Sequence, residues 1–169
     1  MATVRIIGID PGFDRLGVCI VDKDERKEVC IYSTCIVTSR KDSFEKRLVS
    51  LGVDLVKIIE EYSPSELAIE TIFFTNNQKT MVHVAEVRGI CLYECYKRSI
   101  EIFEYSPPQV KLAIAGHGKA SKEDIAIMVP KILKQPIFLK ALDDEIDAIA
   151  IALTHSANRK SKLIHKGIL

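Results

Sequence analysis

The chain has 169 residues, of which 47% are hydrophobic and 28% are charged, a composition that predicts one globular domain with a full core. No apolar stretch reaches the roughly 18 residues that a membrane span needs, and the first residues lack the pattern of a signal peptide. The five cysteines form no CxxC pair and are odd in number, which favours reduced core thiols. We therefore expect a cytoplasmic protein that does not bind membranes.

The formal net charge is only +1, but the charges are unevenly distributed. Residues 105–140 hold six lysines against two acids, residues 141–155 hold four acids and no Lys or Arg, and residues 156–169 hold four bases and no acid. An acidic segment between two basic ones is typical of an enzyme that binds metal with carboxylates and a polyanion with lysines. Chance clustering on a solvated surface produces the same pattern, so charge alone leaves both interpretations open.

The first half of the chain alternates between strand and helix patterns. Apolar, β-branched runs at 4–10, 16–21 and 28–38 predict three strands, and the short links between them predict an antiparallel meander. Apolar residues at three- and four-residue spacing predict a helix over 43–62. A fourth strand follows at 67–70.

The second half contains one more strand and several helices. We expect a helix at about 79–98, a strand at 100–105, a short helix at 109–115, a helix from 121 to 133 and a last helix at 143–157. Together these elements predict an α/β fold, a mixed five-stranded sheet flanked by helices.

The predicted helix at 79–98 is apolar over most of its circumference. Such a helix is buried on two sides, either deep in the core or against a second copy of the chain, and we favour a homodimer interface. Residues 1–157 are expected to form a single domain, followed by a basic, mobile tail at 158–169. His155 is expected to interact with helix carbonyls near the end of the last helix.

Four acids stand where folding could gather them. Asp10 and Glu70 each end an apolar, strand-like run, and Asp144 and Asp147 are three residues apart, on one face of a predicted helix. Helix capping explains Asp144, which lies near the helix N-terminus, but Asp147 lies a full turn further in. Clustered carboxylates of this kind are typical of a Mg²⁺ site, and two such ions are a common device for phosphodiester hydrolysis.

The motifs around these acids resemble those of RuvC, the bacterial Holliday-junction resolvases of the RNase H-like superfamily. The resemblance covers about residues 4–156, with the motifs in the family's order and spacing. The matching motifs are Gly8-Ile9-Asp10-Pro11-Gly12, Ala68-Ile69-Glu70 with Phe73, Val110-Lys111, Gly116-x-Gly118 with Ala120 and Lys122, and Asp144-x-x-Asp147-Ala148-x-Ala150-Ile151-Ala152-x-Thr154-His155.

The resemblance implies a catalytic role for all four acids. Asp10, Glu70, Asp144 and Asp147 would bind two Mg²⁺, with Mn²⁺ as the substitute. One ion would activate a water for in-line attack on phosphorus and the other would stabilise the departing 3′ oxygen, leaving 5′-phosphate and 3′-hydroxyl ends. The expected reaction is paired, symmetric cleavage of a four-way DNA junction.

The resemblance also implies residues that contact DNA. Phe73 would be an aromatic wedge that stacks on a base near the junction point. Lys111 and Lys122 would contact backbone phosphates. Lys119 goes beyond the family match; we assign it to DNA binding because it extends the basic character of the Gly-rich loop. A core role for Phe73 and an ordinary surface role for the lysines are the alternatives. The implied partners are a second copy of the chain and the branch-migration proteins RuvA and RuvB.

Other functions share some of these features. Another RNase H-like nuclease, acting on structured RNA or on an RNA–DNA hybrid, would carry the same acids. A nucleotide-binding domain of the actin and sugar-kinase type also opens with a strand and an Asp-x-Gly turn, but it needs a second, related domain. A non-catalytic junction-binding module is the third alternative, and the presence of all four acids argues against it.

Overall fold

The computed structural model describes residues 3–72, 78–134 and 142–167. Among these residues lie five strands: β1 (Val4–Asp10), β2 (Arg15–Lys23), β3 (Glu28–Val37), β4 (Glu66–Glu70) and β5 (Glu101–Tyr105). The same residues form five helices: α1 (Phe44–Tyr62), α2 (Gln78–Lys97), α3 (Pro107–Ala115), α4 (Lys122–Leu133) and α5 (Asp143–His165). This is the predicted order of elements. None of the described helices is both long enough and apolar enough to span a membrane.

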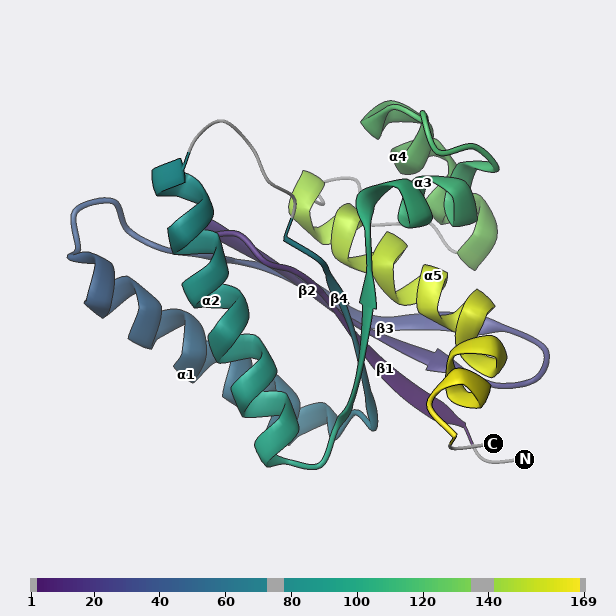
Figure 1. Ribbon diagram of the computed structural model, residues 1–169, viewed down its shortest axis with the longest axis horizontal. Helices are drawn as coiled ribbons and strands as arrows, with labels where there is room; N and C mark the ends of the chain where they lie inside the picture. The colour runs from purple at the N-terminus through teal and green to yellow at the C-terminus, as the bar shows by residue number, and fades with distance from the viewer. Residues whose placement is uncertain (1–2, 73–77, 135–141, 168–169) are drawn as a thin grey trace.

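The strands form one mixed sheet in the order β3-β2-β1-β4-β5. Strands β1, β2 and β3 pair antiparallel as the predicted meander, whereas β1, β4 and β5 run parallel. Figure 1 shows α1 and α2 on one face of this sheet and α5 crossing the other face, with α3 and α4 next to it. The predicted α/β fold, a mixed five-stranded sheet between helical layers, is confirmed.

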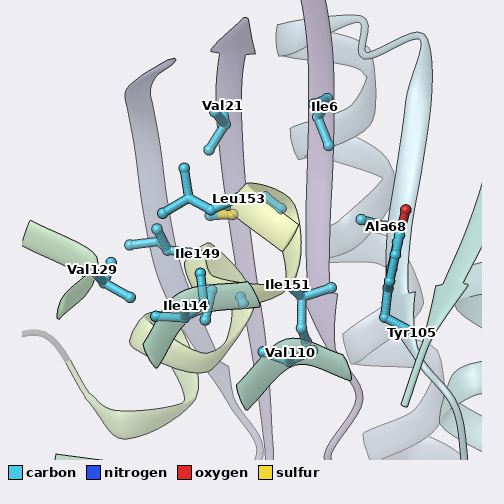
Figure 2. Close-up of a cluster of buried hydrophobic side chains, with 14 of the residues drawn as sticks. Ile6, Val21, Ala68, Tyr105, Val110, Ile114, Val129, Ile149, Ile151 and Leu153 are labelled. Carbon is cyan, nitrogen blue, oxygen red and sulfur yellow. The ribbon is translucent and has the colours of Figure 1, made fainter. Parts of the chain in front are cut away.

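Side-chain alternation along the strands divides the core in two, because successive residues point to opposite faces of the sheet. Ile6 and Ala68 belong to the cluster that α3, α4 and α5 cover, while Ile7, Ile9 and Leu67 belong to the cluster under α1 and α2. Figure 2 shows the first of these clusters, with side chains from the sheet and from the three helices that include Ile6, Val21, Ala68, Val110, Ile114, Val129, Ile149, Ile151 and Leu153. The α5 face is the one that carries the candidate site.

Two helix boundaries differ from the predicted ones by more than one residue. Helix α3 begins at Pro107, two residues early, because proline fits the first turn of a helix, where its missing N–H has no intrahelical acceptor to lose. Helix α5 continues to His165, so the predicted end at Ala157 is wrong. The helix continues because Leu163, only 3% exposed, still packs into the core beneath it.

His155 lies within α5 and is fully buried, so the predicted contact with carbonyls at a helix end is wrong. Its Nδ1 lies 2.8 Å from the hydroxyl of Tyr105 in β5, and its Nε2 lies 2.8 Å from the carboxylate of Glu66 in β4. Arg159 donates to the same carboxylate at 2.7 Å, and the imidazole stacks on Phe103 with ring centroids 4.2 Å apart. These contacts fix α5 against β4 and β5, since sliding the helix would leave buried polar groups without partners.

Three of the cysteines bear out the expectation of reduced core thiols. Cys19, Cys91 and Cys95 are free and buried. Burial raises the pKa of each thiol, which makes the reactive thiolate rare.

Candidate active site

Asp10 and Glu70 end two parallel strands that lie side by side. Ile9 of β1 is paired with Ile69 of β4, so the next residue of each strand reaches the same edge of the sheet. Alternation along each strand turns both carboxylates to the face that α5 covers. Strand pairing therefore brings the first two predicted site residues together.

Two glycines allow α5 to lie directly on β1 and β2. A methyl group at Gly8 would lie 2.4 Å from the carbonyl oxygen of Ala148, and one at Gly17 would lie 2.0 Å from the carbonyl oxygen of Asp144. Any side chain at either position, even the methyl group of alanine, would therefore push the helix away. The close approach brings the two acids at the start of α5, Asp144 and Asp147, to the strand ends.

A pocket of about 320 Å³ opens at this edge of the sheet. Three of the four predicted carboxylates line it, namely Asp10, Glu70 and Asp147. Lys111 of α3 and Lys122 of α4 also line it. The rest of its wall is apolar and consists of Pro107, Val110, Ile125 and Ile151. Acids and lysines that are far apart in the sequence thus meet in one small pocket.

Burial and crowding raise the pKa values of two acids in this pocket. The pKa of Asp10 rises to about 7, chiefly because it is buried and then because of the negative charges of Glu70, Asp147 and Asp144. Burial, followed by the charge of Asp147, likewise raises the pKa of Glu70 to about 7. Lys122 acts in the opposite direction on both. The pocket therefore favours any proton or cation that reduces its negative charge.

Two basic side chains already pair with the acids of α5. Nζ of Lys122 lies 3.0 Å from Oδ2 of Asp147, and Nε of Arg15 lies 3.1 Å from Oδ2 of Asp144. The second contact is an ion pair without the alignment of a hydrogen bond. Oδ2 of Asp144, which is buried, therefore accepts no hydrogen bond from the described residues. Asp144 does not line the pocket itself but flanks it.

Arg15 is a site residue that the sequence motifs missed. The available signal was its position two residues before Gly17 in β2, because residues two apart in a strand face the same side. Once Gly17 lies against Asp144, Arg15 lies on the same face at the start of the strand. Nothing in the sequence, however, predicts that this part of β2 meets the start of α5.

The chemical type of the available donor atoms suits a hard divalent cation. All the donors are carboxylate oxygens, which Mg²⁺ and Mn²⁺ prefer over softer ligands, and the buried Oδ2 of Asp144 has no hydrogen-bond donor to lose. As they stand, no three His, Cys, Asp or Glu side chains in the described part of the chain are close enough together to hold an ion. Coordination would therefore need the carboxylates to move closer together around the ion.

The remaining predicted DNA contacts are not tested by this geometry. Lys119 is exposed, follows α3 and does not line the pocket. Phe73 lies outside the described residues. Both assignments stay predictions.

Comparison with known proteins identifies similar sequences over nearly the whole chain. A family model described as crossover junction endodeoxyribonuclease RuvC matches residues 6–155. The protein of that name from Finegoldia magna is 37% identical over 163 residues, which cover 96% of this chain and 99% of that one. Its counterpart from Thermotoga maritima is 32% identical, and the match covers 97% of each chain.

Solved structures agree with this relationship. Thermus thermophilus RuvC in complex with a Holliday junction substrate matches with a TM-score of 0.86 at 29% identity, over 94% of this chain and 96% of that one. The yeast mitochondrial Holliday junction resolvase Ydc2 matches with a TM-score of 0.67 at 16% identity, over 98% of this chain and 85% of that one. The second match supports the fold alone.

Proposed function

Because the chain belongs to the RuvC family of crossover junction endodeoxyribonucleases, we propose that its carboxylate pocket resolves four-way DNA junctions by paired, symmetric hydrolysis. The family resemblance predicted from the motifs is correct. The observation that carries the proposal is the pocket itself, in which Asp10, Glu70 and Asp147 meet Lys111 and Lys122. This combination of acids and lysines suits metal binding beside a phosphate backbone.

The four carboxylates are the proposed metal ligands. Asp10, Glu70, Asp144 and Asp147 hold two Mg²⁺, for which Mn²⁺ substitutes. Metal held by these carboxylates would supply the chemistry for in-line attack of water on phosphorus and for departure of the 3′ oxygen, which leaves 5′-phosphate and 3′-hydroxyl ends. The protein contributes the positions of the ligands, which two strand ends and the first turns of α5 hold from separate directions.

The basic residues are the proposed DNA contacts. Lys111 and Lys122 in the pocket wall pair with the phosphates next to the cleaved bond. Lys122 exchanges its contact with Asp147 for a phosphate when DNA and metal enter. Lys119 binds the backbone further out, and Phe73 stacks on a base at the junction point, a contact worth about 1–3 kcal/mol.

The active form is the proposed homodimer. A four-way junction has two-fold symmetry, so a symmetric pair of subunits places one active site on each of two equivalent strands. The proposed contact face lies on α1 and α2, which are side by side on the outside of the molecule (Figure 1). It carries Val49, Val53, Tyr93 and Tyr96, each at least 50% exposed. An apolar groove of about 510 Å³ runs between the two helices.

The proposed setting is recombination and repair of DNA in the cytoplasm. RuvA and RuvB, the branch-migration proteins implied by the family, are the proposed partners. They would deliver junctions whose branch point can move until a cleavable sequence reaches the pocket.

Asp10→Asn tests the proposed role of the acids. The substitution keeps the shape of the side chain but removes a metal ligand and a negative charge facing the DNA. We expect cleavage of a four-way junction to fall by roughly 100-fold or more, about 3 kcal/mol of transition-state stabilisation, while affinity for the junction stays the same or rises. Both are measured on labelled junctions, with Glu25→Gln at the exposed turn after β2 as the matched control. Retained cleavage, or a loss of binding, would contradict the proposed role.

A further inference from the structure

Arg15 stands at the edge of the active site without a role in the proposed reaction. It is the first residue of β2, and Gly17, two residues on, touches the backbone of Asp144. The side chain of Arg15 is 47% exposed, whereas that of Asp144 is 19% exposed, and the shortest contact between them joins Nε to Oδ2 at 3.1 Å. Arg15 therefore reaches Asp144 from the solvent side.

The pair differs from an ordinary surface ion pair in its surroundings. Exposed pairs usually contribute little, because water screens both charges. Here the carboxylate lies close enough to Asp10 for its charge to raise the pKa of that buried acid, and its Oδ2 accepts no hydrogen bond within the described chain. Among the ion pairs of the described residues, the only one that this oxygen makes is with the guanidinium of Arg15.

We propose that Arg15 is the resident counter-ion of Asp144 in the metal-free protein, and that it competes with the divalent cation for Oδ2. This inference rests on the proposed function, since it takes Asp144 to be a metal ligand. Arg15 is in this sense a positioning residue: it acts on the metal through Asp144. Its charge limits the affinity of the site for metal.

The competition follows from the permanent charge of arginine. A guanidinium does not lose its proton in a protein, so it cannot become neutral when a cation approaches. It either moves away from Oδ2 or stays and repels the incoming ion, and both outcomes weaken metal binding. By thermodynamic linkage, a contact that stabilises only the metal-free state weakens metal binding by the same free energy. Lys122 stands in the same relation to Asp147, but it also faces the DNA in the proposed reaction.

Arg15→Met removes the charge while keeping an unbranched side chain of similar length. The matched control is Arg26→Met, which makes the same change at the exposed turn beyond the other end of the nine-residue strand β2, about 30 Å away. Mn²⁺ and Mg²⁺ binding are measured by calorimetry on full-length protein freed of metal and without DNA. We expect the Kd of Arg15→Met for Mn²⁺ to be at least threefold lower than that of the wild type, and that of Arg26→Met to be unchanged.

Thermal unfolding gives a second readout that does not depend on activity. In EDTA, Arg15→Met should unfold at a lower temperature than the wild type, because Asp144 has lost its counter-ion. Saturating Mn²⁺ should raise the Tm of Arg15→Met by more than it raises that of the wild type. Arg15→Lys, which keeps the charge, should bind metal with a Kd between those of the wild type and Arg15→Met.

The outcomes separate this inference from the proposed function. Unchanged or weaker metal binding by Arg15→Met, with normal binding by the wild type, would overturn the role of Arg15 and leave the proposed function standing. A wild type that shows no saturable binding of Mn²⁺ or Mg²⁺, or an Asp144→Asn variant that binds as the wild type does, would instead contradict the proposed metal site.

Discussion

At the scale of single residues, Asp10 and Glu70 are set apart by their surroundings. Each ends a strand and faces α5, where burial and neighbouring carboxylates raise its pKa to about 7, against ordinary values of about 4. The metal-free protein therefore binds protons at these sites that the unfolded chain has already released. The resulting contribution to stability is fully present below about pH 4 and is lost as the pH rises through about 7.

Because the raised pKa of Asp10 makes its ionised form unfavourable in the folded protein, we predict that Asp10→Asn stabilises the metal-free protein at high pH. At pH 8 the variant lacks one of the crowded negative charges, so its free energy of unfolding should exceed that of the wild type by about 1–3 kcal/mol. At pH 5 most of this difference should disappear, because Asp10 of the wild type is then protonated. Urea unfolding in EDTA at both pH values measures the effect, with Glu25→Gln at an exposed turn as the control. A difference of equal size at pH 5 and pH 8 would refute the raised pKa.

The sequence pointed to the four acids but not to Arg15 or to the contacts of His155. Asp10 and Glu70 follow apolar runs directly, and Asp144 and Asp147 share a helix face, so local patterns were enough to find all four. Arg15 and His155 were missed or misassigned because their roles depend on contacts with distant segments. Arg15 meets a carboxylate of α5, and His155 meets Tyr105 and Glu66 on two strands. Such pairings exist only once the sheet and α5 have packed.

At the scale of elements, α5 assembles the site. It lies on β1 and β2 at glycine positions, and the buried contacts of His155 hold it against β4 and β5. Its length was underestimated because the region after Ala157 is strongly basic, a composition typical of a tail. The buried Leu163 shows that its apolar face nevertheless continues. Strand and helix order, by contrast, follows from periodicity that each segment carries by itself.

Gly17→Ala should disturb the site through α5. The added methyl group would lie 2.0 Å from the carbonyl oxygen of Asp144, so the start of the helix must move. We expect a loss of about 2–4 kcal/mol in the free energy of unfolding and a clear loss of junction cleavage. Gly118→Ala is the matched control for the unfolding measurement, since its nearest contact would be an ordinary one at 3.6 Å. A Gly17→Ala protein as stable and active as the wild type would show that the close approach is not needed.

At the scale of the whole molecule, the two faces of the sheet have different tasks. The α5 side carries the pocket, and α1 and α2 lie on the opposite side (Figure 1). These two helices carry exposed valines and tyrosines. The sequence predicted the two-sided apolar character of α2 but not the contribution of α1, because Val49 and Val53 look like ordinary surface positions until the groove between the helices is seen.

Tyr93→Glu should weaken the proposed dimer. The side chain is 61% exposed on α2 and lines the groove, so a carboxylate there would have to leave water on association. That desolvation is costly even with Lys97 nearby. We expect sedimentation velocity to show the variant as a monomer at concentrations where the wild type is a dimer. Ile164→Glu, which places the same charge at an equally exposed position on α5, should leave the dimer intact. A wild type that is monomeric throughout, or a Tyr93→Glu protein that stays dimeric, would argue against this interface.

The most direct test of the central claim is cleavage of four-way DNA junctions, one immobile and one with a partly mobile branch point, in Mg²⁺. Linear duplex DNA and an RNA–DNA hybrid serve as competing substrates. The account predicts paired, symmetric nicks confined to the junctions, with 5′-phosphate and 3′-hydroxyl ends, and no cutting in EDTA. Preferential cutting of the hybrid, or no cutting of any substrate by well-folded protein with Mg²⁺ or Mn²⁺, would contradict it.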